Sequence, residues 1–377
     1  MLEVYFFLMI LFIVFLLLEY MTLTKSVEKI PIRILVNGIR GKTTTVKILY
    51  NILKQSDYNV FAKTTGDQAV EFLADGTTKT IRRRSPTSII ENVGILRKWS
   101  KKHPDAIVVE SMALHPENQR MLAEKMIKPT HMIITNILHD HFETMGNDIQ
   151  SISRTLQESF YSKAQKILPE NYSYFYKPVQ NTLYYKSKLF EIDFPNIPSE
   201  VINKNWGLIN SICVELNLDL EIAYNKFHEE WKKSNNNIRI KNKKLNFEFW
   251  NLFSVNDYDS SKLFIEHIMK KESNKYKLEI IFNTRFDRPL RTKSFIPLLT
   301  EYFSNNLIVL VGSGSNLAFR HLKKSSCKNY SKISITDIDK KFKSGFRNRT
   351  LIIGIGNHFG MNDLIEEIKL LNSGENL

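Results

Sequence analysis

The apolar positions of this chain fall into short runs separated by polar segments, and only the first run is long. Val4 to Leu18 is apolar throughout. With Tyr20, Met21 and Leu23 the run reaches about 20 residues, near the length that a helix needs to cross a bilayer. Glu19 is the one charge that interrupts it. The pattern predicts a transmembrane helix within residues 1–24, and a buried amino-terminal helix is the alternative.

The residues around this run indicate its orientation. Lys25, Lys29 and Arg33 follow it, and the positive-inside rule then places the rest of the chain in the cytoplasm. A cleaved signal peptide is not favoured, because the chain starts Met1-Leu2-Glu3 without a basic segment and shows no small-residue cleavage site.

A second pattern joins a strand, a glycine turn and a helix. The β-branched run Ile32–Val36 predicts a strand, and apolar residues at helical spacing follow Lys42. Between them, Gly38 and Gly41 permit a tight turn that brings backbone N–H groups close to a ligand. The sequence therefore predicts a phosphate-binding loop over residues 37–44, with Lys42 on the phosphates and Thr43 on magnesium.

Further strands are predicted to end beside this loop, because ligand sites in open α/β sheets gather beyond the carboxyl ends of strands. The run 59–62 leads into Lys63-Thr64-Thr65-Gly66, which is either an ordinary turn or part of the site. The run 106–109 ends at Glu110, and a carboxylate there is suited to hold magnesium directly or through water.

Two polar segments keep alternative interpretations open. A third strand, 131–138, leads into His139-Asp140-His141, which invites a zinc interpretation, although no third ligand stands at metal spacing. The basic run 81–86 is either a solvated loop or a clamp for carboxylates and phosphates.

The totals restrict the classes of function. At 377 residues two domains are expected, and a net charge of +14 predicts an anionic partner. The scattered lysines and the lack of RNP, helix-turn-helix or metal-finger patterns argue against nucleic acid. Cys213 and Cys327 fit no CxxC pattern, so neither a disulfide framework nor a zinc site is indicated and a reducing compartment is expected.

The carboxyl-terminal third returns to alternating strands and helices after an Asn/Lys-rich stretch, 232–244, that we interpret as a linker. Three β-branched runs, 278–282, 307–311 and 351–355, predict a small α/β domain. The segment 354–360 carries a GxGxxxG pattern, which we interpret as a structural turn in preference to a dinucleotide site.

Together these segments resemble the Mur ligase superfamily, ATP-dependent amide ligases that include folylpolyglutamate synthases. The short GxxGKTT loop, the strand ending in Glu-Ser and the Asn-x-x-x-Asp-His-x-x-x-Met-Gly segment carry the resemblance. The runs 37–42, 63–66 and 110–113, with Asp140-His141, are most similar to the ligase subunits of capsular poly-γ-glutamate synthases. His139 departs from the acidic residue expected there.

The resemblance implies a fold and a site. The expected fold is α/β: a P-loop, parallel-sheet ATP-binding domain over 30–240 and a smaller Rossmann-like domain over 245–377. It implies ATP and Mg²⁺ as cofactors, Thr43, Glu110 and His141 as metal ligands, and Lys42, Glu110 and His141 as catalytic residues. The nucleotide would be bound by Gly38, Arg40, Gly41, Lys42, Thr43 and Thr44, and substrate by Lys63, Thr64, Thr65, Arg285 and Arg288.

The implied reaction activates a glutamate carboxylate as an acyl phosphate, which the amine of another glutamate converts to a γ-amide. The implied partners are glutamate and the growing poly-γ-glutamate chain, membrane lipid, a small integral-membrane synthase subunit and an export-type subunit. The enzyme would be a single-pass membrane protein with cytoplasmic catalytic domains. The alternatives are a folylpolyglutamate synthase-like ligase and a membrane-tethered P-loop ATPase. The stereochemistry and length of the polymer, the number of metals and the oligomeric state are not indicated.

Overall fold

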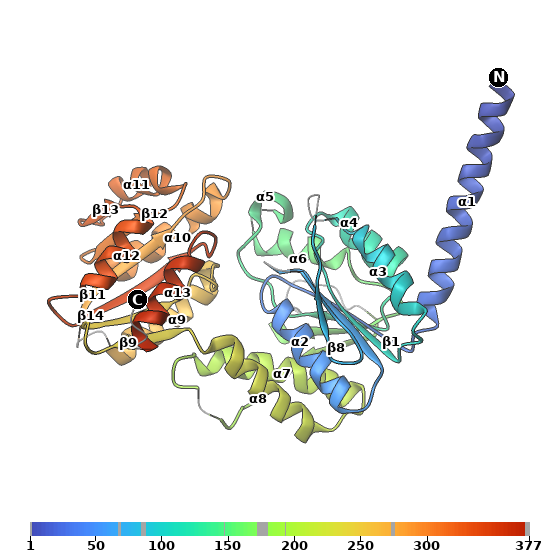
Figure 1. The fold of residues 1–377 in the computed structure, drawn as a ribbon, viewed down its shortest axis with the longest axis horizontal. Coiled ribbons are helices and arrows are strands. Elements are labelled where there is room, and N and C mark those ends of the chain that lie inside the picture. The colour runs from blue at the N-terminus through green and yellow to red at the C-terminus, as the bar shows by residue number, and fades with distance from the viewer. Residues whose placement is uncertain are drawn as a thin grey trace. The chain divides into compact units, whose positions relative to one another are not determined.

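The computed structural model describes residues 2–66, 69–83, 88–146, 148–171, 180–192, 194–272 and 276–373. These residues form two compact units, each with its own sheet (Figure 1). Unit 1 comprises residues 1–137, 144–191 and 203–231, and unit 2 comprises residues 138–143, 192–202 and 232–377. The α/β fold expected from the sequence is confirmed.

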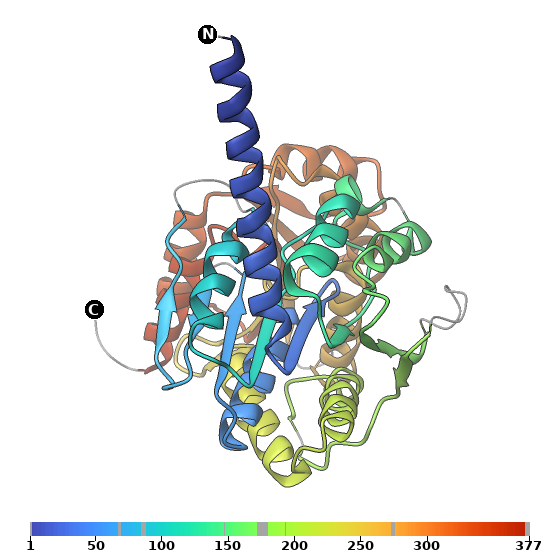
Figure 2. The same cartoon turned by 90° about the vertical axis from the view of Figure 1, so that its right-hand side faces the viewer.

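Helix α1 (Leu2–Glu28) begins the chain, and most of it projects from unit 1 as a single rod (Figure 2). Its apolar side chains are exposed from Val4 to Leu18, whereas Leu23 and Val27 are buried against the unit. The helix is long and apolar enough to cross a membrane. An exposed apolar surface of this length is unfavourable in water.

The sheet of unit 1 has the order β4-β3-β2-β5-β1-β6-β7-β8. Strands β2, β5, β1, β6, β7 and β8 run parallel, and β3 and β4 add an antiparallel edge. Their bounds are β1 (Ile32–Asn37), β2 (Val60–Thr64), β3 (Val70–Phe72), β4 (Thr78–Thr80), β5 (Ala106–Glu110), β6 (His131–Ile134), β7 (Gln165–Pro169) and β8 (Thr182–Tyr185). The central strands β1, β2 and β5 are almost wholly buried, as expected for a parallel sheet covered on both faces.

The helices of unit 1 connect these strands. After α1 they are α2 (Lys42–Gln55), α3 (Glu91–Ser100), α4 (Pro116–Arg120), the π-helical turn η1 (Met121–Ile127), α5 (Phe142–Met145), α6 (Ile149–Gln157), α7 (Ser199–Glu215) and α8 (Leu220–Asn235). The first two residues of α5 and the first residues of α7 fall in the segments assigned to unit 2, as do the last residues of α8. Helix α2 packs on β2 and β5 through an apolar face that includes Val46, Leu49 and Leu53.

The sheet of unit 2 has the order β13-β12-β11-β14-β10-β9 and is parallel except for its edge strand β9. The strands are β9 (Arg239–Asn242), β10 (Phe247–Asn251), β11 (Lys277–Asn283), β12 (Leu307–Val311), β13 (Tyr330–Lys332) and β14 (Thr350–Gly356). The helices are α9 (Tyr258–Glu272), α10 (Pro289–Phe303), α11 (Ser315–Lys323), α12 (Ile335–Ser344) and α13 (Asn362–Ser373).

Three predicted boundaries differ from the observed ones. Strand β2 continues through Thr64, beyond its predicted end at Ala62, and β6 ends at Ile134, before the predicted Leu138. The Asn/Lys-rich stretch 232–244 contains the end of α8 and all of β9, which pairs with β10. The polar composition of the stretch reflects an edge strand, where only one side is buried. Both cysteines are free and buried, and burial raises the pKa of Cys213 to about 12.

Candidate active site

The predicted phosphate loop lies between the end of β1 and the start of α2. Gly38 and Gly41 have φ values of 120° and 78°, which a residue with a side chain rarely adopts. A Cβ atom on Gly38 would lie 2.3 Å from the hydroxyl oxygen of Thr135, so there is no room for a larger residue. The turn leads into the amino end of α2, whose unpaired N–H groups favour an anion.

Polar side chains from distant segments hold the loop in place. Asn37 donates to Gln119 and to Ser159, at 2.9 and 3.0 Å. The backbone amide of Arg40 donates to the side chain of Asn136 at 2.9 Å. Sequence reasoning did not identify Gln119 and Ser159, because neither stands in a recognisable pattern.

Glu110 is the carboxylate closest to the loop among the predicted residues of unit 1. It ends β5 and is 4% exposed. Its oxygen Oε2 accepts hydrogen bonds from the hydroxyl of Thr43 at 2.9 Å and from the backbone amide of Thr65 at 2.8 Å. The structure thus brings together three predicted site residues: Thr43 at the start of α2, Thr65 just after β2, and Glu110 at the end of β5. Both donors are neutral, and a buried carboxylate with such neighbours suits a hard cation.

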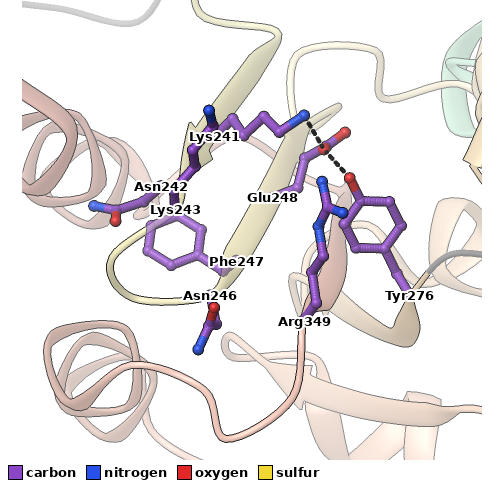
Figure 3. A pocket seen from close by; sticks show the side chains of 8 residues that line it. All are labelled: Lys241, Asn242, Lys243, Asn246, Phe247, Glu248, Tyr276 and Arg349. Carbon is purple, nitrogen blue, oxygen red and sulfur yellow. Dashed lines mark hydrogen bonds and ion pairs between the residues drawn. The ribbon is translucent and has the colours of Figure 1, made fainter.

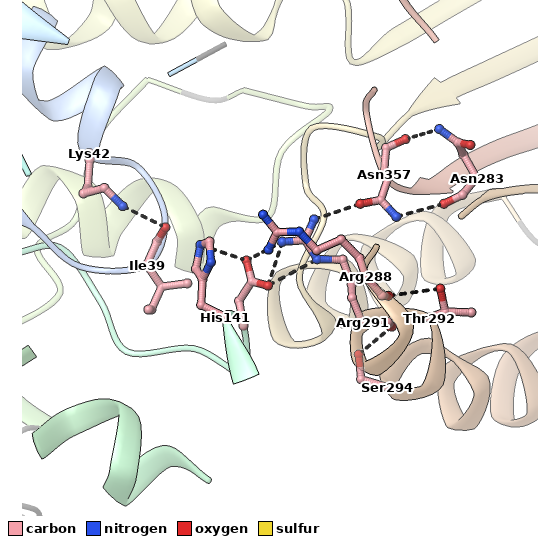
Figure 4. Close-up of polar contacts among 10 residues, drawn as sticks. Ile39, Lys42, His141, Asn283, Arg288, Arg291, Thr292, Ser294 and Asn357 are labelled. Carbon is pink, nitrogen blue, oxygen red and sulfur yellow. Dashed lines mark hydrogen bonds and ion pairs between the residues drawn. The ribbon is translucent and has the colours of Figure 1, made fainter. Parts of the chain in front are cut away.

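Lys42 begins α2, and its ammonium folds back onto the loop. It donates to the carbonyl oxygens of Gly38 at 2.7 Å and of Ile39 at 3.3 Å, the second of which is drawn in Figure 4. Because these carbonyls form the turn itself, the positive charge lies on the loop predicted to bind phosphate.

The predicted Asp140 and His141 fall in the segment 138–143, which packs in unit 2. The carboxylate of Asp140 is 2% exposed and accepts from Nη2 of Arg291 at 2.7 and 2.8 Å and from its Nε at 3.2 Å. Nη1 of Arg291 donates to Asn357 at 2.9 Å, and Asn283 donates to the carbonyl of Asn357 at 2.6 Å. Asp140 is therefore fixed to the carboxyl ends of β11 and β14.

The two histidines beside Asp140 have different neighbours. His141 has a φ of 56°, an uncommon backbone conformation that the surrounding structure has to stabilise. Its Nε2 lies 3.7 Å from Asp140. Nδ1 of His139 lies 2.9 Å from a carboxylate oxygen of Asp259 in α9. Among the described residues, no three His, Cys, Asp or Glu side chains form a group suited to a metal ion.

Comparison with known proteins identifies the family of the chain. The Mur ligase middle domain matches residues 36–191, and the poly-gamma-glutamate synthase CapB C-terminal domain matches residues 238–371. The chain belongs to the Mur ligase superfamily. Within it, the second match places this chain with ligases of the CapB type.

Individual relatives match the sequence of this chain along most of its length. It is 27% identical over 364 residues to the PGA synthase CapB of Bacillus subtilis (strain 168), covering 91% of this chain and 92% of that one. It is 23% identical to the capsule biosynthesis protein CapB of Bacillus anthracis, covering 89% and 76%.

Solved structures of the superfamily share the fold. A MurF from Acinetobacter baumannii superposes with a TM-score of 0.64 at 15% identity, covering 91% of this chain and 78% of that one. E. coli FolC in complex with ADP gives 0.63 at 13% identity, covering 94% and 93%. At these identities the likeness supports the fold alone.

The predicted substrate residues differ from one another in burial and in their partners. Lys63 is fully buried in β2, and its ammonium lies 2.6 Å from both Glu91 and Asn92. Burial lowers the pKa of Lys63. Arg83 of the basic run binds Glu91 through two hydrogen bonds of 2.9 Å, whereas residues 84–87 lie outside the described part of the chain. The ammonium of Lys63 thus forms an ion pair with Glu91 inside unit 1.

Arg285 and Arg288 lie between β11 and α10. Arg285 forms a paired hydrogen bond with Asp287 at 2.9 and 2.7 Å, and its guanidinium lies 4.7 Å from the ring centre of Phe359. Arg288 precedes the first residue of α10, and its carbonyl accepts from Thr292. Both arginines therefore stand at the carboxyl edge of the unit 2 sheet, next to the network of Arg291.

Proposed function

We propose that this chain is an ATP-dependent ligase that joins glutamate units through γ-amide bonds and makes poly-γ-glutamate for a capsule or secreted polymer. The observation that carries the proposal is the match of the CapB C-terminal domain to residues 238–371, together with relatives named CapB that cover 89% and 91% of the chain. The fold alone would fit other amide ligases equally well.

The reaction needs ATP because a carboxylate and an amine do not condense in water. An oxygen of the γ-carboxylate attacks the γ-phosphorus of ATP, ADP leaves, and an acyl phosphate results. The amine of the next glutamate attacks the acyl carbon, phosphate leaves, and one proton is released. The protein contributes chiefly by positioning the reactants and neutralising charge.

The residues of unit 1 are suited to the first step. We assign the nucleotide phosphates to the loop of Gly38, Arg40 and Gly41 and the first turn of α2, which contains Lys42, Thr43 and Thr44. The left-handed glycines and the helix amino end support this assignment. Lys42 acts there as a point charge on the transferred phosphoryl group.

Magnesium fits the donor set of unit 1. Glu110 offers a buried carboxylate whose partners at Oε2 are a hydroxyl and an amide, and Thr43 offers its hydroxyl oxygen. Mg²⁺ takes few protein oxygens and keeps waters and phosphate oxygens as its other ligands. When bound, it neutralises phosphate charge. His141 remains our proposed ligand for a second ion.

Substrate carboxylates are assigned to unit 2 and to the end of β2. Arg285 and Arg288 present guanidinium groups suited to planar carboxylates, and Thr64 and Thr65 offer small polar groups beside Glu110. Lys63 contributes through its ion pair with Glu91, which holds the start of α3 against β2.

The apolar helix α1 supports the proposed location, and the resemblance to poly-γ-glutamate synthases suggests the proposed partners. We propose that α1 crosses the cell membrane once and keeps both units in the cytoplasm, in contact with lipid, with ATP and with glutamate. A small integral-membrane synthase subunit and an export-type subunit are the proposed protein partners, and the growing polymer is the proposed product. Nucleic acid is not among them.

The test is synthesis by membranes that contain the complete complex. ATP and glutamate should yield a polyanion that resists ordinary proteases, and ADP should form only when glutamate is present. Glutamate addition to folate in place of polymer would favour a folylpolyglutamate synthase. ATP hydrolysis without any amide product would favour a membrane-tethered ATPase.

A further inference from the structure

Unit 2 contains a pocket at the end of its sheet opposite to Asn283 and Asn357. The pocket has a volume of about 270 Å³, and its lining includes Lys241, Lys243, Phe247, Glu248, Tyr276 and Arg349 (Figure 3). Tyr276 immediately precedes β11, and Arg349 immediately precedes β14. The pocket therefore lies at the amino ends of these strands, and the active-site residues of unit 2 lie at the carboxyl ends.

The floor of the pocket is a neutralised carboxylate. Glu248 is 0% exposed, and it binds the guanidinium of Arg239 at 2.7 Å and the hydroxyl of Tyr276 at 2.9 Å. Arg239 also pairs with Glu272 at 2.9 Å, and Lys241 lies 3.7 Å from Glu248. The two positive and two negative charges of this group cancel, and they fix the positions of Tyr276 and Lys241.

The rim of the pocket adds further positive charge. The guanidinium of Arg349 lies 4.5 Å from the ring centre of Tyr276, which holds it at the opening. The side chain of Lys243 is exposed in the turn between β9 and β10. Two cations therefore remain in excess over the balanced floor, and Figure 3 shows them on either side of the pocket. An anionic group of side-chain size fits such a site.

We infer that this pocket is a second binding site for carboxylates of the growing poly-γ-glutamate chain. The inference rests on the proposed function. Each residue of a γ-linked chain keeps a free α-carboxylate and spans about 6 Å when extended. Strand β11 has 7 residues and is about 20 Å long. About four glutamyl residues therefore reach from the carboxyl edge of the sheet to the pocket.

A second site of this kind would keep the polymer bound between successive additions of glutamate. A chain held only at its reacting end is lost whenever that end dissociates, whereas a second contact makes rebinding intramolecular. The pocket thus favours repeated addition to one chain over release of short products.

The experiment compares two double variants that lose the same charge. Lys243→Ala/Arg349→Ala removes the rim, and Lys324→Ala/Lys340→Ala removes two exposed lysines elsewhere on unit 2. Binding to the full-length protein in detergent is measured with a fluorescent γ-linked glutamate decamer, with a glutamate dimer and with inorganic phosphate. Product length and the rate of the first addition are measured in membranes with the complete complex.

The rim variant is expected to bind the decamer about tenfold more weakly than the wild type, to bind the dimer unchanged, and to make shorter product at an unchanged initial rate. The control variant should match the wild type in all five measurements. Equal decamer affinity in both variants would overturn the inference, and so would inorganic phosphate displacing the decamer at equal charge concentration. Decamer binding is measured without turnover, so it separates this inference from failure of the proposed ligase activity.

Discussion

Two buried carboxylates, Glu110 of unit 1 and Asp140 of unit 2, have opposite surroundings. They are 4% and 2% exposed. Glu110 accepts hydrogen bonds from a hydroxyl and a backbone amide, whereas Asp140 accepts three from one guanidinium. Neutral donors leave the charge of Glu110 available to a cation, whereas Arg291 already neutralises Asp140.

The difference assigns different tasks to carboxylates that look alike in sequence. Glu110 fits the metal of the proposed reaction. Asp140 anchors the segment 138–143 in unit 2 and so determines where His141 lies. A catalytic defect at Glu110 and a structural defect at Asp140 are therefore expected, and the following changes test that contrast.

The largest effect is expected from Glu110→Gln. The amide keeps the shape of the side chain but removes the charge that we assign to magnesium, and several kcal/mol of metal-dependent stabilisation correspond to a loss of about 10³-fold in turnover. Glutamate-dependent ADP formation measures it, with Tm recorded alongside. Lys42→Ala should lose activity similarly without unfolding. Normal turnover in either variant would remove these residues from the site.

Arg291→Ala is expected to act on stability. It removes the guanidinium that binds both oxygens of the buried Asp140 carboxylate, and the loss of one partner of a buried ion pair costs about 3–5 kcal/mol. Denaturant unfolding measures this loss, and Asp140→Asn in the same background should restore part of it. The matched control is Arg285→Ala, because the Arg285–Asp287 pair is partly exposed and should contribute less than about 1 kcal/mol. Equal losses from the two arginines would contradict the contrast.

Gly38→Ala tests the loop that faces Glu110. Alanine at this position would have a positive φ and a Cβ atom 2.3 Å from the hydroxyl oxygen of Thr135. This strain is expected to lower the free energy of unfolding by about 1–3 kcal/mol, and the affinity of the loop for ATP should fall as well. Gly94→Ala in α3 is the control, since a Cβ atom there meets nothing within 4 Å and should be neutral or slightly stabilising. ATP binding unchanged by the loop variant would exclude the loop as its site.

The smallest effect is expected from Arg288→Ala. If unit 2 binds substrate carboxylates, the KM for glutamate should rise about tenfold while the KM for ATP stays near the wild-type value. Steady-state kinetics with each substrate varied in turn measure both. An equal loss for the two substrates would indicate that unit 2 contacts nucleotide first.

Much of unit 1 was predictable because its signals are local. A β-branched strand, two glycines and a lysine at a helix start specify the phosphate loop within about a dozen residues. The metal-binding role proposed for Glu110 came from its place in the sequence, because a carboxylate at the end of a buried strand is unfavourable without a cation. Long-range polar contacts were not predictable: Gln119 and Ser159 bind Asn37 from segments whose sequence indicates nothing.

By itself, the sequence determined the apolar amino-terminal helix, the α/β alternation, the glycine turn between β1 and α2, and the position of Glu110. Only the tertiary structure decided that Lys63 pairs with Glu91, that Arg291 neutralises Asp140, and that Lys243 and Arg349 flank one pocket. The reason is physical. Backbone conformation and burial of apolar runs depend on neighbours in sequence, whereas the task of a charged side chain depends on its partner, which the fold brings from far along the chain.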